Sequence, residues 1–522
     1  MSGASCVHSI HARRRFLAQA AALAAASALP SCATRAQKPS FTSDPYTLGI
    51  ASGSPREESV VLWTRLAPRP LEGGGLDPVP FTVRWQVAHD EGFQRIAREG
   101  QEIATPDGAH AVHAEAGGLE PGRAYFYRFI CGDAVSPVGR TRTTPRAGQG
   151  DERLRFAFAS CQQYEQGFYV AHRHLAAEQP DLVLFLGDYI YESSWGRDHV
   201  RHYGVANPYT LEEYRNRYAV HKGDADLQRA HAAAPWIVTW DDHEVQNDYA
   251  NDRGEELDPN FLARRQAAYR AFYEHMPLRK SVLVDGGYRI YDRFEWGALA
   301  TFHVVDDRQY RAYEVCPKPG RGGSNVVGAA CTERLDPSRT MLGAAQEAWL
   351  DAGFARSRAR WNVLTQQTLM APAGGRDKDG RLMHWTDGWD GYPAARAKLL
   401  DSMVRNALSN PVVIGGDVHA QYFADLHRDP EDIASPIVAA ELCGTSITSQ
   451  GPSAARVQTI MDASPWIRYG TGSLRGYTLV DVTRDGLEAR LRAVDTVKRT
   501  EASIRTARTA RVAAGRPGLE VA

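Results

Sequence analysis

The sequence predicts a layered α/β domain preceded by a small all-β domain of the immunoglobulin or fibronectin sandwich type. Short β-rich runs separated by turn residues, without a helical period, place the all-β domain at residues 44–146. Further on, near-continuous apolar runs of strand length alternate with helical patterns, which is typical of a sheet with both faces covered. These later runs end in polar side chains, so we expect residues 151–498 to carry the functional site.

Composition excludes several classes of protein. The 522 residues include 61 Lys and Arg against 62 Asp and Glu, and this balance argues against a protein that binds polyanions. No nucleic-acid-binding module is evident. A hydrophobic content of 43% excludes wholesale disorder, and seven cysteines in so long a chain do not form a disulfide scaffold. We expect a monomer without a transmembrane span in its mature form.

Residues 1–33 are interpreted as an export signal. Arg13, Arg14 and Arg15 precede Phe16-Leu17 and an Ala-rich apolar run, which is the order of a twin-arginine signal. The run is too short for a membrane span, which needs about 20 apolar residues. The alternative is a fortuitous arginine cluster before an amphipathic helix, which the position and order disfavour. The twin-arginine translocase is therefore the expected partner during export.

Two ways of processing this signal are open. Ser31-Cys32-Ala33 offers a small-residue cleavage site after Ala33. Leu29-Pro30-Ser31-Cys32 also resembles a lipobox, which would anchor the protein through a lipidated Cys32, although Pro30 is unusual there. In both cases we expect a periplasmic or secreted protein, where disulfides are allowed. Twin-arginine export of folded proteins also suits a protein whose metal is inserted before export.

Five cysteines remain after residue 33: Cys131, Cys161, Cys316, Cys331 and Cys443. Because the number is odd, at least one lies outside an intramolecular disulfide. Cys316 and Cys331 bracket a Gly-rich loop and are the expected pair.

The all-β domain is read from four runs, at residues 59–64, 81–87, 110–115 and 119–129. In the last run, Tyr125, Tyr127 and Phe129 alternate with other residues after a Pro-Gly turn. This pattern predicts a strand entered through a tyrosine-corner-like turn. Residues 143–150 are the expected linker. The domain has no acid, base or ligand cluster, so we expect it to support the rest or to form one wall of the site.

The α/β domain is read from six apolar runs, each followed by polar residues. The runs span 154–159, 181–186, 235–240, 299–305, 361–365 and 410–414. The polar ends are Ser160-Cys161-Gln162, Gly187 to Tyr191, Asp241 to Glu244, Asp306 to Arg308, Gln366-Gln367 and Gly415 to His419. Helices are expected at 170–178, 344–358 and 394–408, the last entered through Pro393. A lone Asp or His after a strand is usually a cap or turn residue, but the recurrence favours one shared site.

The residue types at these ends indicate a metal site. Asp188 and Asp417 are hard anionic oxygen ligands, and His419 could join them. Cys161 and Tyr191 are thiolate and phenolate donors, which favour a transition metal over calcium or magnesium alone. A phenolate at neutral pH implies a strong Lewis acid such as Fe(III), because free tyrosine titrates near pKa 10.

Other polar residues suit a second, harder cation and phosphate chemistry. Asp242, Asn247 and Asp248 add oxygen ligands for such a cation. Adjacent cations suit phosphoryl transfer, because they hold phosphoryl oxygens and activate a water. His243 could bind the phosphoryl group or protonate the leaving oxygen. Arg308 could clamp the phosphate; the alternative is a surface arginine in a loop.

Several motifs together resemble the PhoD-type alkaline phosphatase/phosphodiesterase family. They are Ala159-Ser-Cys-Gln162, Gly187-Asp-Tyr-Ile-Tyr-Glu192, Trp240-Asp-Asp-His-Glu-Val-Gln-Asn-Asp-Tyr249, Asp307-Arg-Gln-Tyr-Arg311, Trp389-Asp-Gly-Tyr-Pro393 and Gly415-Gly-Asp-Val-His419. The resemblance covers essentially the whole mature chain and includes the β domain and the export signal. It implies a calcineurin-like metallophosphatase core that binds Fe(III) and Ca(II).

The resemblance also implies roles for individual residues. Cys161, Asp188, Tyr191, Asp417 and His419 would ligate metal, with Asn247 on the calcium side. The chain departs from the common metallophosphatase pattern at Ser160-Cys161-Gln162 and Asp242-His243-Glu244. Asp242 is taken as a metal ligand, but the sequence leaves its exact role open. It also leaves open whether Asp241, Asp248 and Asp306 ligate metal.

The predicted function is an exported metal-dependent phosphoesterase that hydrolyses phosphomonoesters, phosphodiesters or both. A phospholipase D of the same family is the alternative within this chemistry. A non-catalytic cell-surface binding protein would need Cys161 and Tyr191 to be structural. An iron-dependent redox enzyme is disfavoured by the absence of a 2-His-1-carboxylate triad. The basic tail, residues 499–522, is expected to be either a lid for anionic substrates or a solvated helix.

Overall fold

The computed structural model describes residues 39–149 and 153–522. The predicted export signal, its cleavage site after Ala33 and the lipobox at Cys32 lie outside these residues. Among the described helices, none combines the length and apolar character that a membrane span requires.

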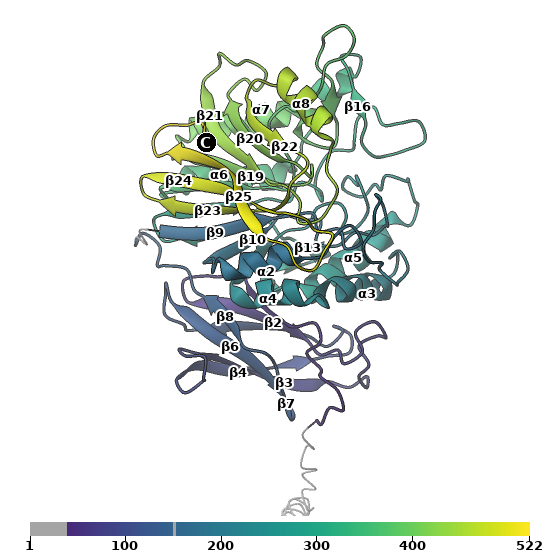
Figure 1. Cartoon of the computed structure of the whole chain (residues 1–522), viewed down its shortest axis with the longest axis vertical. Helices are drawn as coiled ribbons and strands as arrows, with labels where there is room; N and C mark the ends of the chain where they lie inside the picture. The colour runs from purple at the N-terminus through teal and green to yellow at the C-terminus, as the bar shows by residue number, and fades with distance from the viewer. Residues whose placement is uncertain (1–38, 150–152) are drawn as a thin grey trace, which may run out of the picture. The chain divides into compact units, whose positions relative to one another are not determined.

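Ten strands form the larger sheet. Their order is β26-β25-β24-β23-β9-β10-β11-β1-β2-β5. Figure 1 labels β25, β24, β23, β9, β10 and β2 of this sheet. The bounds are β1 Ile50–Gly53, β2 Ser59–Arg65, β5 Ala111–Gly117, β9 Arg153–Ala159, β10 Leu182–Phe185, β11 Pro235–Val238, β23 Arg475–Thr483, β24 Gly486–Val494, β25 Ile504–Ala513 and β26 Glu520–Val521. Strands β9, β10 and β11 are parallel, with Leu184 opposite Phe158 on one side and Ile237 on the other.

Seven strands form the second sheet, in the order β14-β15-β17-β19-β21-β20-β22. The bounds are β14 Asp292–Trp296, β15 Ala300–Val304, β17 Trp361–Thr365, β19 Pro411–Gly415, β20 Gln421–His427, β21 Ile437–Cys443 and β22 Ile467–Thr471. The parallel strands β15, β17, β19 and β21 occupy its centre.

The six apolar runs are therefore divided between two sheets, which corrects the expectation of one sheet. The sheets pack on each other through a buried cluster that includes Phe156, Phe158, Phe302, Val363 and Ile414. Each strand is buried on both faces, by the other sheet on one side and by helices on the other. A continuous apolar run does not distinguish this arrangement from a single sheet between helices.

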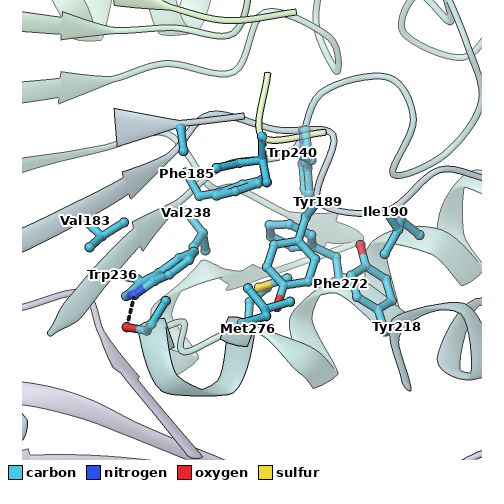
Figure 2. Packing of buried hydrophobic residues seen from close by; sticks show 14 of the residues in the cluster. Val183, Phe185, Tyr189, Ile190, Tyr218, Trp236, Val238, Trp240, Phe272 and Met276 are labelled. Carbon is cyan, nitrogen blue, oxygen red and sulfur yellow. Dashed lines mark hydrogen bonds between the residues drawn. The ribbon is translucent and has the colours of Figure 1, made fainter. Parts of the chain in front are cut away.

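Helices cover the outer face of each sheet. The ten-stranded sheet is covered by α2 Val170–Ala177, α3 Leu211–Lys222, α4 Ala225–Ala233 and α5 Phe261–His275. Figure 2 shows Val183, Phe185 and Trp236 of this sheet facing Phe272 and Met276. The seven-stranded sheet packs with α6 Ala344–Arg356, α7 Pro393–Arg405 and α8 Ala454–Ala463. The three helices expected from the sequence are confirmed, and Pro393 is the first residue of α7.

Short elements complete the connections of the α/β core. They are the 3-10 helices η1 Lys280–Val282, η2 Thr332–Leu335 and η3 Trp389–Gly391, and the strand pairs β12 Leu283–Val284 with β13 Gly287–Tyr288 and β16 Val326–Val327 with β18 His384–Trp385. Cys316 and Cys331 form the expected disulfide, and the other described cysteines, Cys131, Cys161 and Cys443, are buried thiols.

The N-terminal segment is all-β, but one of its layers belongs to the core. Its own sheet comprises β3 Phe81–Ala88, β4 Ile96–Ala104, β6 Ala124–Cys131, β7 Ala134–Val135 and β8 Gly139–Arg142. The facing layer is β1, β2 and β5, which continue the ten-stranded sheet because β1 pairs in parallel with β11. A separate immunoglobulin-type sandwich is thus not confirmed. The tyrosine-corner-like turn is present, since Tyr125 Oη accepts the Glu120 N–H at 2.9 Å.

The C-terminal tail is neither a lid nor a helix. Residues 504–513 form β25, which pairs along its length with β24, and β26 follows at the edge (Figure 1). Ala510 and Val512 point into the core between the sheets, while Arg511 pairs with Glu488 at the surface. Buried Ala510 and Val512 therefore alternate with exposed Arg511 and Ala513, which is the period of two of a strand with one buried face.

Candidate active site

The ends of strands from both sheets bring the predicted metal ligands together. Cys161 follows β9, Asp188 follows β10, and Asp417 and His419 follow β19. The two sheets meet here through a parallel bridge between Ser160 and Ser446. The ligand atoms of Cys161, Asp188 and His419 lie within 4.8 Å of one another. The geometry thus gathers residues that are 258 positions apart in the sequence, from 161 to 419.

The backbone at these strand ends is unusual. Cys161, Asp188, Asp417 and His419 all have positive φ, at 60°, 54°, 64° and 51°. Few residues other than glycine adopt this region, and such strain clusters at functional sites. Gly187, with φ of 106°, precedes Asp188, and a Cβ at that position would lie 2.3 Å from the Cβ of Asp241. Glycine there allows the ends of β10 and β11 to approach closely.

Tyr191 lies within this cluster, as predicted. Its hydroxyl donates to Asp188 Oδ2 at 2.7 Å, lies 3.0 Å from His419 Nε2 and accepts a hydrogen bond from Ser449 Oγ. Burial, followed by the charges of Asp188 and Cys161, raises the pKa of the Tyr191 phenol well above 10. A phenolate in this place would therefore need a cation beside it.

Tyr189 points away from the cluster. Its hydroxyl lies 2.8 Å from Nε2 of His231 on α4. Figure 2 shows its ring among the buried side chains between the sheet and the helices, near Phe272 and Met276.

His419 is oriented as metal-ligating histidines are. Nδ1 lies 3.0 Å from the carbonyl oxygen of Gln450, so Nδ1 carries the proton and Nε2 faces Tyr191 and Asp188. The indole of Trp195 stacks on the other side of the imidazole, with ring centroids 5.5 Å apart. These contacts fix the ring with its free nitrogen toward the cluster.

Asp242 adjoins two further clusters. Its ligand atom lies within 4.8 Å of those of Asp188 and His243, and likewise of those of Asp241 and Asp417. Its two oxygens also accept the backbone N–H groups of His243 and Asp248. Burial opposes its charge, but Arg308 and His243 hold the pKa of Asp242 below its usual value.

Carboxylates outnumber the cationic side chains in this place. Burial, with the charges of neighbouring carboxylates, raises the pKa of Asp241 and Asp417 well above the usual value, although Arg308 opposes it. Asp188 Oδ1 and Asp241 Oδ2 are buried without a hydrogen-bond partner in the described chain. Buried, unpaired carboxylate oxygens are costly unless they coordinate a cation. The donor set, with its thiol, phenol, imidazole and carboxylates, therefore fits metal binding.

Arg308 does not occupy the place expected of a phosphate clamp or of a surface residue. Its side chain is wholly buried. Nε donates to Asp241 Oδ1 at 2.5 Å, and the two terminal nitrogens donate to the two oxygens of Asp387 at 2.5 and 2.8 Å. Because its donors are directed at two buried carboxylates, Arg308 holds Asp241 in position from behind the site.

His243 faces the cavity with a defined partner. Nδ1 lies 2.7 Å from Glu192 Oε2, and the ring packs on Tyr191 with centroids 4.2 Å apart. Burial lowers the pKa of His243, but the charges of Glu192, Asp242 and Asp188 outweigh it and raise that pKa well above 6.5. With Nδ1 engaged by Glu192, Nε2 is the nitrogen available to a substrate.

Asn247 and Asp248 lie in the turn that follows. Asn247 donates through Nδ2 to Glu255 at 3.1 Å, and Asp248 accepts from the N–H and hydroxyl of Ser324. Burial, followed by the charges of Asp387 and Asp242, raises the pKa of Asp248 to about 7. Asp306 lies apart from this group, because its carboxylate accepts hydrogen bonds from Arg308 and Gln309 within its own loop.

A cavity of about 670 Å³ opens over these groups. One wall presents polar residues, including Asp242, His243, Asn247, Asp417 and His419. Another presents apolar and aromatic residues, including Val326, Leu369, Ala371, Trp385 and Tyr422. The cavity therefore has room for a polar group at the cluster and an organic substituent beside it.

Sequence reasoning missed several residues that hold the site. Glu244 accepts the backbone N–H groups of Asp188, Tyr189 and Asp241, and so joins the ends of β10 and β11. Thr368 donates to Asp417 Oδ2 at 2.6 Å. Glu192 and Glu244 lie in the Gly187–Glu192 and Trp240–Tyr249 motifs, and this is the one signal that could have singled them out. Thr368 shows no distinguishing local pattern.

Comparisons with known proteins agree with this geometry. The family model described as PhoD-like phosphatase matches residues 156–491, and that described as PhoD-like phosphatase, N-terminal domain matches residues 31–145. Alkaline phosphatase D of Bacillus subtilis is 45% identical over 482 residues, which cover 90% of this chain and 81% of that protein. A solved structure titled "Structure of PhoD" is 44% identical with a TM-score of 0.88, and the match covers 92% of this chain and 93% of that one.

Proposed function

The chain belongs to the PhoD-like phosphatase family and is a phosphoric ester hydrolase, and on this premise we propose that it is an exported, metal-dependent phosphodiesterase and phosphomonoesterase. The observation that carries the metal dependence is the cluster of Cys161, Asp188 and His419 ligand atoms within 4.8 Å, of which His419 lines the cavity.

Fe(III) is the proposed occupant of this cluster. Cys161, Asp188, Tyr191, Asp417 and His419 would hold it, because a thiolate and a phenolate among hard oxygen ligands suit a strongly Lewis-acidic transition metal. Ca(II) is the proposed neighbour, on the side of Asn247 and Asp242, where carboxylate and amide oxygens gather. Bound together, such cations would lower the pKa of a water molecule and offset charge on the phosphoryl oxygens.

The chain's own residues supply the rest of the reaction. The phosphoryl group would lie against the polar wall, with the ester substituent along Leu369, Ala371 and Tyr422. His243, kept protonated by Glu192, would donate from Nε2 to a phosphoryl oxygen or to the leaving oxygen as the P–O bond breaks. Glu244 and Thr368 would keep Asp188 and Asp417 in position during this step.

Because one wall of the cavity is apolar, phospholipid esters are also candidate substrates. A phospholipase D activity would use the same cluster and differ only in the ester that occupies the cavity. Export through the twin-arginine route is proposed from residues 1–33, so the protein would work in the periplasm or be secreted.

Metal analysis of natively exported protein, with hydrolysis assays on a phosphomonoester, a phosphodiester and phosphatidylcholine, tests the proposal. We expect iron and calcium in the protein, loss of activity on calcium chelation and recovery on calcium addition. Full activity in metal-free protein would contradict it. A protein that binds metal but hydrolyses none of a broad ester panel would favour the non-catalytic binding role.

A further inference from the structure

A second cluster of metal-ligand type lies outside the site described above. It consists of Glu165, on the loop between β9 and α2, and of His199 and His202, on the loop between β10 and α3. Their ligand atoms lie within 4.8 Å of one another. Glu165 Oε2 is 3.9 Å from His199 Nδ1, and Glu165 Oε1 is 3.4 Å from His202 Nδ1.

One oxygen of the carboxylate in this cluster lacks a hydrogen-bond partner. Glu165 is 4% exposed, and its Oε2 has no hydrogen-bond partner among residues 39–149 and 153–522. Its Oε1 lies 3.4 Å from the backbone nitrogen of Tyr203 and 3.4 Å from Nδ1 of His202. A buried carboxylate oxygen without a partner is unfavourable. This oxygen is directed toward the two histidines. A cation bound between the three side chains would therefore compensate for the missing hydrogen bond.

The orientation of His199 is that of a ligand. Its Nε2 lies 2.8 Å from the carbonyl oxygen of Trp195, and a carbonyl only accepts, so Nε2 carries the proton. In the neutral imidazole, Nδ1 then presents its lone pair toward Glu165. Metal-ligating histidines commonly donate their other ring N–H to a carbonyl in this way.

We propose that Glu165, His199 and His202 form a peripheral site for a divalent transition metal of the zinc class. Two imidazole nitrogens and one carboxylate oxygen, with a fourth position left to water, are a common zinc donor set. Bond lengths of about 2.0–2.1 Å place neighbouring tetrahedral ligand atoms about 3.4 Å apart. The separations of 3.4 and 3.9 Å need only a small movement of His199, and His202 is 79% exposed and free to adjust.

Metal at this site would fix the wall of the cavity. Both histidines follow Trp195 in the chain, and the carbonyl of Trp195 accepts from His199 while its indole stacks on His419. Trp195 also lines the cavity. A cation that joins this loop to Glu165 would therefore hold Trp195 against His419. This inference concerns separate ligands and does not depend on the proposed function.

The test is zinc binding by the purified holoprotein and by His202→Ala. Equilibrium dialysis against zinc, followed by metal analysis, should find one equivalent less zinc in His202→Ala than in the wild type. Zinc should also raise the melting temperature of the wild type more than that of the variant. His174→Ala is the matched control, because His174 is a partly buried histidine bonded to the carbonyl of Ala502 and lies outside the cluster.

Equal zinc content in the wild type and His202→Ala would overturn the proposal. It would mean that the cluster is an ion pair between Glu165 and protonated histidines. Glu165→Gln provides a second arm, since it keeps the shape of the side chain and removes the anionic ligand. Retention of the zinc equivalent by a folded Glu165→Gln protein, with an unchanged circular dichroism spectrum, would likewise contradict it.

Discussion

Glu192 connects His243 to the neighbouring turn through its two carboxylate oxygens. Oε2 lies 2.7 Å from His243 Nδ1, and Oε1 accepts the backbone N–H of Asn247 at 2.9 Å. Burial opposes the charge of Glu192, but His243 and this N–H bond lower the pKa of the carboxyl below its usual value. One buried anion thus keeps the proposed proton donor protonated and also fixes the backbone of the proposed calcium side.

Removal of this anion should impair the chemical step. Glu192→Gln is expected to lower kcat about 10- to 100-fold, as losses of such supporting partners do, with a smaller effect on KM. Steady-state kinetics on a phosphodiester measure this. The alkaline limb of the kcat profile should also move to lower pH, because His243 must be protonated to donate and loses its supporting charge. Glu212→Gln, on the exposed face of α3, is the control. An unaltered kcat in Glu192→Gln would remove His243 from the proposed role.

Tyr191 and Tyr189 offer a matched spectroscopic comparison. If Tyr191 binds Fe(III) as a phenolate, the native protein is coloured, and Tyr191→Phe should bleach or shift the visible band. Tyr189→Phe should leave the band unchanged, because its hydroxyl contacts His231 on the far side of the strand end. Visible absorption spectra of the iron-loaded proteins decide the matter. A colourless, fully active wild type that contains only zinc would exclude the iron assignment.

Arg308 should matter for stability rather than for substrate affinity. Its loss leaves Asp241 buried without its countercharge, while Asp387 keeps only Arg311, and breaking a buried pair typically costs about 3–5 kcal/mol. Arg308→Met should therefore lower the free energy of unfolding by about that amount, as measured by urea denaturation. A stable variant with only a raised KM for phosphate esters would instead restore the clamp role predicted from the sequence.

Lys222 predicts a pH dependence away from the site. It is buried on α3, with Nζ 4.1 Å from the ring centroid of Trp63, and burial lowers its pKa from 10.5 to about 7. Because the pKa of Lys222 is lower in the folded state than in the unfolded state, protonation of Lys222 lowers the free energy of unfolding. This loss of stability is fully present below about pH 7 and disappears as the pH rises toward 10.5.

Lys222→Met should accordingly be the more stable protein at pH 7, by a few kcal/mol. The difference between the two proteins should shrink as the pH approaches 10.5, and urea denaturation at several pH values follows it. A difference that does not change with pH would mean that Lys222 stays protonated throughout, held by Trp63.

The strand ends could be predicted from the sequence because each apolar run and its polar terminus are local features. Cys161 and Asp188 follow neighbouring parallel strands, so parallel order brings them to one edge of the sheet. Asp417 follows a strand of the other sheet and joins them because the two sheets pack together. The division into two sheets could not be predicted in this way, because a strand such as β15 is buried on both faces in either arrangement. Likewise, Arg505, Arg508 and Arg511 recur every three residues in β25, and this spacing gave no sign of a strand that pairs with β24.

Residues that act through distant partners were also beyond prediction. In the sequence, Arg308 looks like an arginine in a surface loop. Its partners Asp241 and Asp387 lie 67 and 79 positions away in the chain, so only the structure shows that Arg308 is buried between them. Glu244 shows the same limit, because its partners are backbone N–H groups that no side-chain pattern marks.

The central claim is that the cluster at the strand ends binds the metal on which ester hydrolysis depends. Asp417→Ala tests it most directly, with iron content and phosphodiester hydrolysis measured on the same preparation. Asp417 lies in the cluster with Asp241 and Asp242 and receives one side-chain hydrogen bond, from Thr368. We predict loss of bound metal and of activity together, with circular dichroism unchanged. Wild-type activity in Asp417→Ala protein that has lost its iron would contradict the account.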